Sequence, residues 1–318
     1  MSVFDLFRES PPLFFGVVAF LGLFVGSFLN VVIHRLPIMM ERDWAAGLRE
    51  LEAERQASAI AVGAGGPSVV ATDGPDGHVV GAGPDGVEAP APFNLAIPRS
   101  RCPSCDAPIS AWQNVPVVSW LVLRGRCAHC KTPISVRYPL VEAMTMILSL
   151  VVAWHFGPTP AAVLGIVVTW FLVAMSMIDV DTQLLPDSLT LPLMWIGLIA
   201  SLFPVFADVR DAVVGAALGY LVLWSIYWLF KLVTGKEGMG YGDFKLLAAI
   251  GALLGWEALP MVILLSSVVG AVVGIALIVV TRRSKEIPIP FGPYLAAAGW
   301  IAMIWGEPLR TWYGTLFG

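Results

Sequence analysis

The sequence predicts an all-α polytopic membrane protein with about eight transmembrane helices and a cytoplasmic zinc-knuckle loop between the first two. Of its 318 residues, 57% are hydrophobic and 13% charged, whereas a soluble chain carries roughly a quarter charged residues. The mean hydropathy is +0.79. The apolar residues gather in segments close to the ~20 residues that a helix needs to cross a bilayer.

The expected transmembrane helices follow one another as eight apolar segments. They are residues 13–33, 139–156, 161–179, 189–206, 211–232, 244–256, 259–281 and 293–306. The sixth and the eighth are short for a crossing, so the count of eight depends on them. The first is not expected to be a cleaved signal, because Asp5 and Glu9 precede it against only Arg8 and no A-x-A site follows directly after it.

The basic residues predict which side of the membrane each loop faces. If the N-terminus lies outside the cytoplasm and the chain crosses eight times, all of the 19 basic residues except Arg8, Arg210 and Arg310 face the cytoplasm. Positive residues stay on the cytoplasmic side, so this orientation is preferred, although the loop 34–138 is long and long loops weigh less. The net charge of −4 does not favour a nucleic-acid partner.

Three regions are expected along the chain. Residues 1–33 form an N-terminal tail and the first helix, residues 34–138 a cytoplasmic loop, and residues 139–318 a membrane-embedded core. Within the loop, residues 57–92 are rich in Gly, Ala, Pro and Val, repeat "GPDG" and contain no Lys or Arg. This composition cannot bury enough apolar surface to order itself, so we expect a flexible insertion. A four-cysteine module follows it at residues 99–135.

The four cysteines of that module form two C-x2-C pairs. Cys102 pairs with Cys105 and Cys127 with Cys130, and 21 residues separate the pairs. Two such pairs at this spacing are typical of a tetrahedral zinc site, in which each pair offers two thiolates from a tight turn. Two disulfides are the alternative, but they do not persist in a reducing cytoplasm. Four thiolates leave no open coordination position, so the zinc is expected to be structural.

Carboxylates stand where two apolar helices are expected to meet the cytoplasm. Asp179 lies at the end of the third span, in "MIDVDTQLLPD", and Asp243 lies just before the sixth, in "GMGYGDFKLL". Acids at a membrane edge are costly and therefore indicate function. Two carboxylates a few ångströms apart share one proton. The ionised one can draw a proton from water while the protonated one polarises a carbonyl, which is aspartyl protease chemistry.

Structural roles are the alternative for each acid. Asp187 is expected to cap the fourth span, and Asp181 to be a solvated loop acid or to support a neighbour. Asp243, judged alone, is equally well explained as a cap of the sixth span. Glu142 is placed in the first turn of the second span, where its charge suits the helix dipole. The glycines of "GMGYGD" permit either close helix packing or close approach of an extended substrate backbone.

Other chemistries and functions are less well supported. The sequence has no G-x-S-x-G, no H-E-x-x-H and no cysteine outside the two pairs. The main alternative is a transporter or channel with a zinc-bearing regulatory domain, but the acids of an ion path are expected through the membrane depth rather than at one face. A scaffold for secretion machinery is another, and it would tolerate Asn in place of Asp179 and Asp243.

Several stretches together resemble the bacterial prepilin peptidases. They are "GSFLNVVIHRLP" (26–37), the two cysteine pairs, "IDVDTQLLPD" (178–187), "GKEGMGYGDFKLLAAIGA" (235–252) and "IPFGPYLA" (289–296). The "GYGD" also resembles the G-x-G-D signature of the wider intramembrane aspartyl proteases. The resemblance spans nearly the whole chain except residues 57–92, which look longer and richer in glycine than the family's usual first loop.

The resemblance implies catalytic residues and substrates. The family's two catalytic aspartates fall on Asp179 and Asp243, so residues 139–318 would be an aspartyl protease core. The family's substrates are type IV prepilins and the pseudopilins of type II secretion, cut after the glycine that ends a short basic leader. The new N-terminal residue, usually phenylalanine, is then methylated from S-adenosyl-L-methionine. Gly125, in "RGRC", matches a glycine that the family associates with methyl transfer.

Together with the charge pattern, the resemblance implies a multi-pass protein of the bacterial cell inner membrane, with its N-terminus periplasmic and its active site at the cytoplasmic face. The expected partners are prepilins, pseudopilins and the lipid bilayer. No nucleotide-binding βαβ unit is visible, so the sequence does not locate the methyl-donor pocket. It also leaves open whether the chain forms a homo-oligomer.

Overall fold

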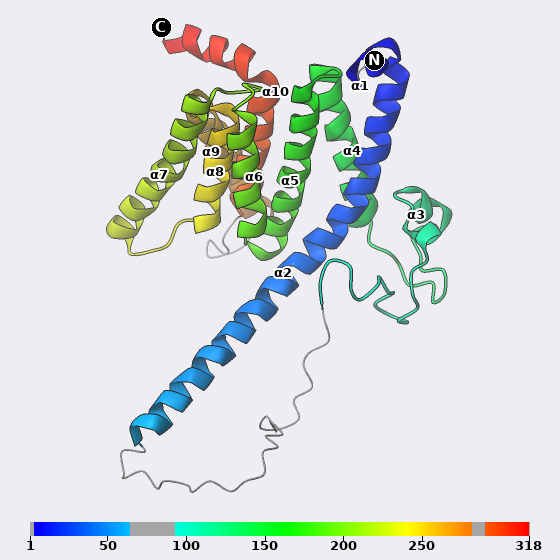
Figure 1. Ribbon diagram of the computed structural model, residues 1–318, viewed down its shortest axis with the longest axis vertical. Helices are drawn as coiled ribbons and strands as arrows, with labels where there is room; N and C mark the ends of the chain where they lie inside the picture. The colour runs from blue at the N-terminus through cyan, green and yellow to red at the C-terminus, as the bar shows by residue number, and fades with distance from the viewer. Residues whose placement is uncertain (1–2, 64–92, 282–289, 318) are drawn as a thin grey trace, which may run out of the picture. The chain divides into compact units, whose positions relative to one another are not determined.

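The structure is a computed structural model that describes residues 3–63, 93–281 and 290–317. Within these ranges it contains α-helices and two 3-10 helices and no β-strand, as expected for an all-α protein (Figure 1). The helices are α1 (Val3–Glu9), α2 (Pro11–Gly63), η1 (Ala111–Asn114), α3 (Val118–Val122), α4 (Arg137–Phe156), α5 (Pro160–Thr182), α6 (Asp187–Ala200), α7 (Val209–Thr234), α8 (Tyr241–Leu254), η2 (Trp256–Ala258), α9 (Leu259–Thr281) and α10 (Gly292–Phe317).

The chain divides into two compact units. One consists of residues 1–37 and 100–318, and it holds the helix bundle and the four cysteines. The other, residues 38–99, holds the second part of α2. There the Arg42 guanidinium carbon lies 4.1 Å from the centroid of the Phe93 ring. Every candidate site residue described below belongs to the first unit.

Helix α2 is longer than the sequence predicts. The first span was expected to end at residue 33, but the helix continues to Gly63. Residues 38–56 are rich in Glu, Arg, Ala and Leu, which are good helix formers. The prediction of a flexible insertion is therefore wrong for residues 57–63, which are helical. The rest of that insertion, residues 64–92, lies outside the described residues.

Five segments of the described chain are long and apolar enough to cross a bilayer, as expected of a multi-pass membrane protein. They are Pro11–Gln56, Arg137–Phe156, Pro160–Thr182, Val209–Thr234 and Trp256–Leu277. Helices α6 and α8 have 14 residues each. They therefore measure about 21 Å, against a hydrocarbon layer of roughly 30 Å. The segments expected at 189–206 and 244–256 thus form helices shorter than a full crossing.

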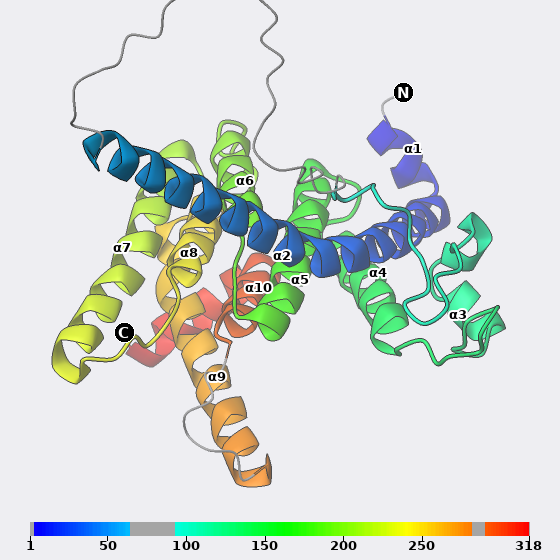
Figure 2. The same cartoon turned by 90° about the horizontal axis from the view of Figure 1, so that it is seen from below.

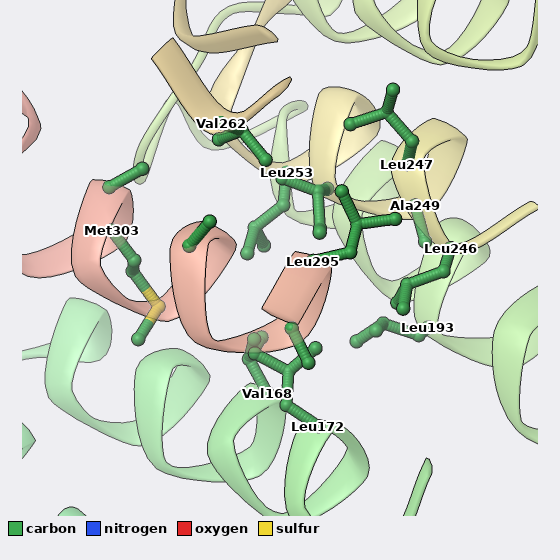
Figure 3. Packing of buried hydrophobic residues seen from close by; sticks show 14 of the residues in the cluster. Val168, Leu172, Leu193, Leu246, Leu247, Ala249, Leu253, Val262, Leu295 and Met303 are labelled. Carbon is green, nitrogen blue, oxygen red and sulfur yellow. The ribbon is translucent and has the colours of Figure 1, made fainter. Parts of the chain in front are cut away.

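Helix α8 lies inside the bundle, where α6, α7 and α10 pack against it (Figure 1). Its sequence "LLAAIGALL" is apolar on every side, which is typical of a helix buried all round. Leu246, Leu247, Ala249 and Leu253 of α8 lie among side chains of α5, α6, α9 and α10 (Figure 3). Because such a core is close-packed, it holds the axis of α8 in place among its neighbours.

Helix α7 approaches α8 closely at glycines. A Cβ atom on Gly219 would lie 2.6 Å from the carbonyl oxygen of Leu247, and Gly215 lies against the backbone of Gly251. Small residues four positions apart let two membrane helices come this close. Larger side chains at these positions would separate α7 from α8.

The second half of α9 extends away from the bundle (Figure 2). Its apolar side chains are exposed there, with Val272 and Ile275 at 63% and Val280 at 80%. On a helix long enough to cross a bilayer, exposed apolar side chains suit contact with lipid chains.

Candidate active site and metal centre

The structure brings Asp179 and Asp243 to one pocket. Asp179 lies in the last turn of α5 and Asp243 in the first turn of α8, and both are buried, at 5% and 6% exposure. Both side chains line an open pocket with a volume of about 260 Å³. A pocket lined by two carboxylates can supply both the acid and the base of general acid–base chemistry.

The end of α5 positions Asp179. The helix ends at Thr182 because Gln183 takes a left-handed conformation, with φ of 57°, and donates its N–H to the carbonyl oxygen of Asp179. The N–H of Gly292, at the start of α10, donates to Oδ2 of Asp179 at 2.9 Å. A Cβ atom on Gly292 would lie 2.7 Å from the same oxygen, so a larger residue there would displace the carboxylate. The sequence "IPFGPYLA" does not by itself indicate this contact.

The start of α8 positions Asp243. Gly240 is the N-cap residue of α8, so Asp243 is not the cap that the sequence allowed. A Cβ atom on Gly242 would lie 2.5 Å from Cβ of Leu185, in the segment between α5 and α6. Gly242 is therefore needed for packing. A Cβ atom on Gly240 would meet nothing nearer than 4.0 Å, which leaves room for a backbone to approach.

The outer acids of "IDVDTQLLPD" form ion pairs. Asp181 lies in the last turn of α5, not in a loop, and its Oδ1 accepts from Nη1 of Arg137 at 2.7 Å. The cap of α6 is Pro186, so the interpretation of Asp187 as a helix cap is wrong. Asp187 is the first residue of α6 and accepts from Nζ of Lys245 at 2.6 Å and 2.8 Å. Neither cation was singled out in the sequence.

Glu142 also has a different role from the one predicted. Helix α4 begins at Arg137, which places Glu142 in the second turn rather than the first, away from the helix end. Its buried carboxylate accepts from the N–H of Val117 at 2.7 Å. Val117 has φ of 57°, an unusual value for a β-branched residue. Glu142 thus holds the segment before α3 against α4.

The pocket wall carries a third carboxylate. Glu237, in the segment between α7 and α8, lines the pocket and pairs with Nζ of Lys231 at 2.8 Å. That hydrogen bond lowers the pKa of the exposed Glu237 carboxyl, so the group is ionised at neutral pH. Asp179, Asp243 and Glu237 are the ionisable residues that line the described pocket, so its ionisable groups are all acids.

The four cysteines lie in the chain segment that connects α2 to α4, in two turns with the same backbone structure. Each turn is closed by a bridge, from Arg101 to Pro108 in the first and from Arg126 to Pro133 in the second. In each turn the N–H of the first cysteine donates to a carbonyl five residues later, at 3.0 Å and 2.9 Å. The sequence similarity of the two pairs is thus also a structural one.

The cysteine sulfurs form one cluster that can hold a metal ion. All four thiols are free, and their sulfurs lie within 4.8 Å of one another. Hydrogen bonds with the side chain and backbone of Thr132 lower the pKa of the Cys130 thiol to about 6. Backbone hydrogen bonds from Ser104 and Cys105 lower the pKa of Cys102. Both shifts favour the thiolate form that binds metals, whereas, in spite of a backbone hydrogen bond from Ala107, the neighbouring Cys130 and burial raise the pKa of Cys105 to about 11. His129 is exposed.

Gly125 stands at the entry to the second cysteine turn. Its φ is +66°, and a Cβ atom on it would lie 2.8 Å from the ring of Trp120. The N–H of Ile134 donates to the carbonyl oxygen of Gly125 at 2.7 Å, and Nε1 of Trp120 donates to that of Ile134 at 3.2 Å. Glycine at this position therefore joins α3 to the cysteine turn.

Two protein-family models match the chain. The model of the bacterial peptidase A24 N-terminal domain matches residues 20–156, which contain the four cysteines. The model of the type IV leader peptidase family matches residues 166–275, which contain Asp179 and Asp243. No solved structure matches the chain.

Relatives that match nearly the whole chain share one name. The prepilin leader peptidase/N-methyltransferase of Aeromonas hydrophila is 52% identical over 313 residues, which are 98% of each chain. The protein of that name from Stutzerimonas stutzeri is 54% identical over 309 residues, 96% of each chain. The one from Pseudomonas aeruginosa is 50% identical over 313 residues, 98% of each chain. With two matching family models and relatives similar over nearly their whole length, this chain belongs to the type IV leader peptidase family.

Proposed function

We propose that this protein cleaves the leader peptide from type IV prepilins and from type II secretion pseudopilins, and then methylates the new N-terminal residue. One observation carries the proposal: Asp179 and Asp243 line a single pocket in a chain whose full-length relatives are named prepilin leader peptidase/N-methyltransferase. The enzyme is then an aspartic endopeptidase with a second, methyl-transfer activity.

Asp179 and Asp243 are proposed to catalyse the cleavage as a pair that shares one proton. The ionised carboxylate takes a proton from water while the oxygen of that water attacks the scissile carbonyl carbon. The protonated carboxyl group donates to the carbonyl oxygen, and a tetrahedral intermediate forms. The first carboxyl group then gives its proton to the leaving nitrogen and the C–N bond breaks, while the second takes a proton from a hydroxyl of the intermediate, which regenerates the pair. The Gly292 N–H would hold one oxygen of Asp179 during these steps.

The pocket suits the proposed substrate. The open space over Gly240 gives an extended backbone access to Asp243. The ionisable residues that line the described pocket are all acids, and a basic leader residue would compete with Lys231 for the exposed Glu237 carboxylate. Favourable contacts with a cationic leader would select peptides that present their cleavage site at the two acids.

We further propose eight membrane crossings in the bacterial inner membrane, with a periplasmic N-terminus and the active site at the cytoplasmic face. The distribution of basic residues supports this orientation. The short helix α8 would cross within the bundle, covered by its neighbours, and α6 would cross beside it with one face exposed. Residues 1–33, 34–138 and 139–318 would be the N-terminal helix, the cytoplasmic loop and the protease core.

The cysteine module is proposed to hold one structural zinc ion on Cys102, Cys105, Cys127 and Cys130. Four sulfurs at about 2.3 Å from a tetrahedral zinc lie about 3.8 Å from one another. The Sγ atoms of Cys102 and Cys130 are 3.8 Å apart. Four thiolates fill such a site, so the metal would stabilise the module rather than act on substrate.

The methyl group is proposed to come from S-adenosyl-L-methionine, which supplies an electrophilic methyl for transfer to the new amine. Gly125 is proposed to support this step through the shape of the cysteine module, because it packs on Trp120. No residue is assigned to the donor pocket itself.

The direct test is incubation of the purified protein in detergent with a synthetic prepilin N-terminal peptide and S-adenosyl-L-methionine. Mass spectrometry then reports cleavage and methylation separately. We expect cleavage after the leader glycine, followed by a gain of one methyl group on the new N-terminus. An intact peptide after prolonged incubation with folded protein would contradict the proposal.

A further inference from the structure

Each candidate catalytic acid is followed, two positions later in the same helix, by a charged residue. Asp181 follows Asp179 in α5, and Lys245 follows Asp243 in α8. Residues in an α-helix are about 100° apart, so residues two positions apart point to nearly opposite sides. In agreement, Asp179 and Asp243 are buried at the pocket, whereas the Asp181 and Lys245 side chains are 31% and 29% exposed.

The first of these charges ties the end of α5 to α4. The two Asp181 oxygens accept from Nη1 and Nη2 of Arg137, in the two-pronged geometry that fixes orientation as well as distance. Nη2 of Arg137 also donates to the carbonyl oxygen of Met177 at 3.4 Å. Arg137 is the first residue of α4. The last turn of α5 is thus held from the side opposite to the pocket.

The second charge ties the start of α8 to α6. Nζ of Lys245 donates to both oxygens of Asp187, at 2.6 Å and 2.8 Å. Asp187 is the first residue of α6. The signs are reversed relative to the first pair, because here the cation belongs to the helix that carries the catalytic acid.

We propose that these two ion pairs, Arg137–Asp181 and Lys245–Asp187, set the rotation of α5 and α8 and thereby aim the carboxylates of Asp179 and Asp243 at each other across the pocket. None of the four residues lines the pocket, so they are positioning residues. The inference rests on the proposed cleavage by Asp179 and Asp243.

The size of the effect follows from helix geometry. A carboxylate about 5.5 Å from its helix axis moves by about 1.5 Å when the helix turns by about 15°. A misplacement of about 1 Å can lower a rate by a factor of ~100. Partly exposed ion pairs, in contrast, contribute little to folding, so their loss leaves the melting temperature nearly unchanged.

The test compares Arg137→Gln, Asp181→Asn, Lys245→Gln and Asp187→Asn in the peptide cleavage assay. We expect kcat to fall about 10- to 100-fold, with KM and the melting temperature nearly unchanged. Asp211→Asn is the matched control, because it removes the same charge far from the pocket. Asp211 belongs to α7, lies against Gly255 at the other end of α8, and accepts from Nε1 of Trp256. This control is expected to cleave at the wild-type rate.

Charge-swapped double variants separate positioning from a plain electrostatic effect. Arg137→Asp with Asp181→Arg, and Lys245→Asp with Asp187→Lys, rebuild each pair with reversed signs, and we expect them to regain most of the lost kcat. Single variants with unchanged kcat, a change confined to KM, or a shifted pH profile without rescue by the swap would each overturn the inference. Failure of the wild-type protein to cleave would instead count against the proposed function.

Discussion

Asp179 accepts a hydrogen bond from a backbone amide, and the pattern of side chains in the sequence does not predict this contact. The Gly292 N–H holds Oδ2 of Asp179, which leaves Oδ1 as the oxygen without this contact. A main-chain donor at the start of a helix is rigid, so it restricts the carboxylate more than a mobile side chain would. Sequence reasoning found the acid from its position at a membrane edge, but the donor lies 113 residues away and depends on how α10 packs on α5.

Replacement of Gly292 tests this contact. The Cβ atom of Gly292→Ala would lie 2.7 Å from Oδ2, so the carboxylate must move, and we expect cleavage to fall about tenfold or more. Gly16→Ala is the control, because a Cβ atom there meets nothing within 4 Å, and it should cleave normally. The measurement is the rate at which each variant cleaves a prepilin peptide. Equal rates for both variants would show that Gly292 does not hold Asp179.

The Gly125→Ala variant tests whether this glycine acts through the fold of the module. We expect a loss of about 1–3 kcal/mol in module stability, because the residue needs a positive φ and its Cβ atom would meet Trp120. Reduced metal content and earlier thermal unfolding should accompany any loss of methylation. Lost methylation with normal metal content and normal unfolding would indicate instead a direct contact with the methyl donor.

Asp187 and Glu142 show where local reasoning fails at the residue scale. Each has the type and position of a residue that stabilises a helix start, so capping and dipole roles were expected. Both carboxylates instead bond to partners far along the chain, Asp187 to Lys245 and Glu142 to Val117. Such contacts depend on which helices become neighbours, and the amino-acid type does not encode that.

The elements themselves were predictable where apolar runs define them. The segments expected near α4, α5, α7 and α9 form helices long enough to cross a bilayer, because hydrophobic length is visible in sequence. The end of α2 was not predicted, since hydropathy marks where the membrane ends rather than where the helix ends. Polar helix formers then carry α2 past that limit, to Gly63.

The cysteine module is the element most open to test by metal removal. We expect one zinc ion per chain by elemental analysis and its loss in Cys102→Ser or Cys127→Ser. Because metal binding and folding of so small a module are coupled, these variants should become sensitive to proteolysis between residues 99 and 135. Any fall in leader cleavage by these variants then follows from this loss of structure, since no cysteine lines the described pocket. A metal-free wild-type protein with a protease-resistant module would refute the zinc assignment.

The distribution of basic residues predicts how the chain is oriented across the membrane. If the chain crosses eight times, single cysteines placed at Ser2 and Asp208 should react with a membrane-impermeant maleimide added from the periplasmic side. Lys236→Cys should react only after the membrane is opened. The labelling is done with the four native cysteines replaced by serine in a protein shown to insert. The reverse pattern would overturn the proposed topology.

Leader cleavage by Asp179 and Asp243 acting together can be tested with four variants, Asp179→Asn, Asp243→Asn, Asp181→Asn and Asp187→Asn. Cleavage and methylation are measured side by side for each. Asn keeps the size and polarity of Asp, so all four proteins should fold and insert.

We expect no cleavage by the Asp179 and Asp243 variants, since one carboxylate cannot both activate water and polarise the carbonyl. The Asp181 and Asp187 variants should retain slow but measurable turnover. All four should still methylate a pre-cleaved peptide that begins with phenylalanine. Substantial leader cleavage by either the Asp179→Asn or the Asp243→Asn protein would contradict the account.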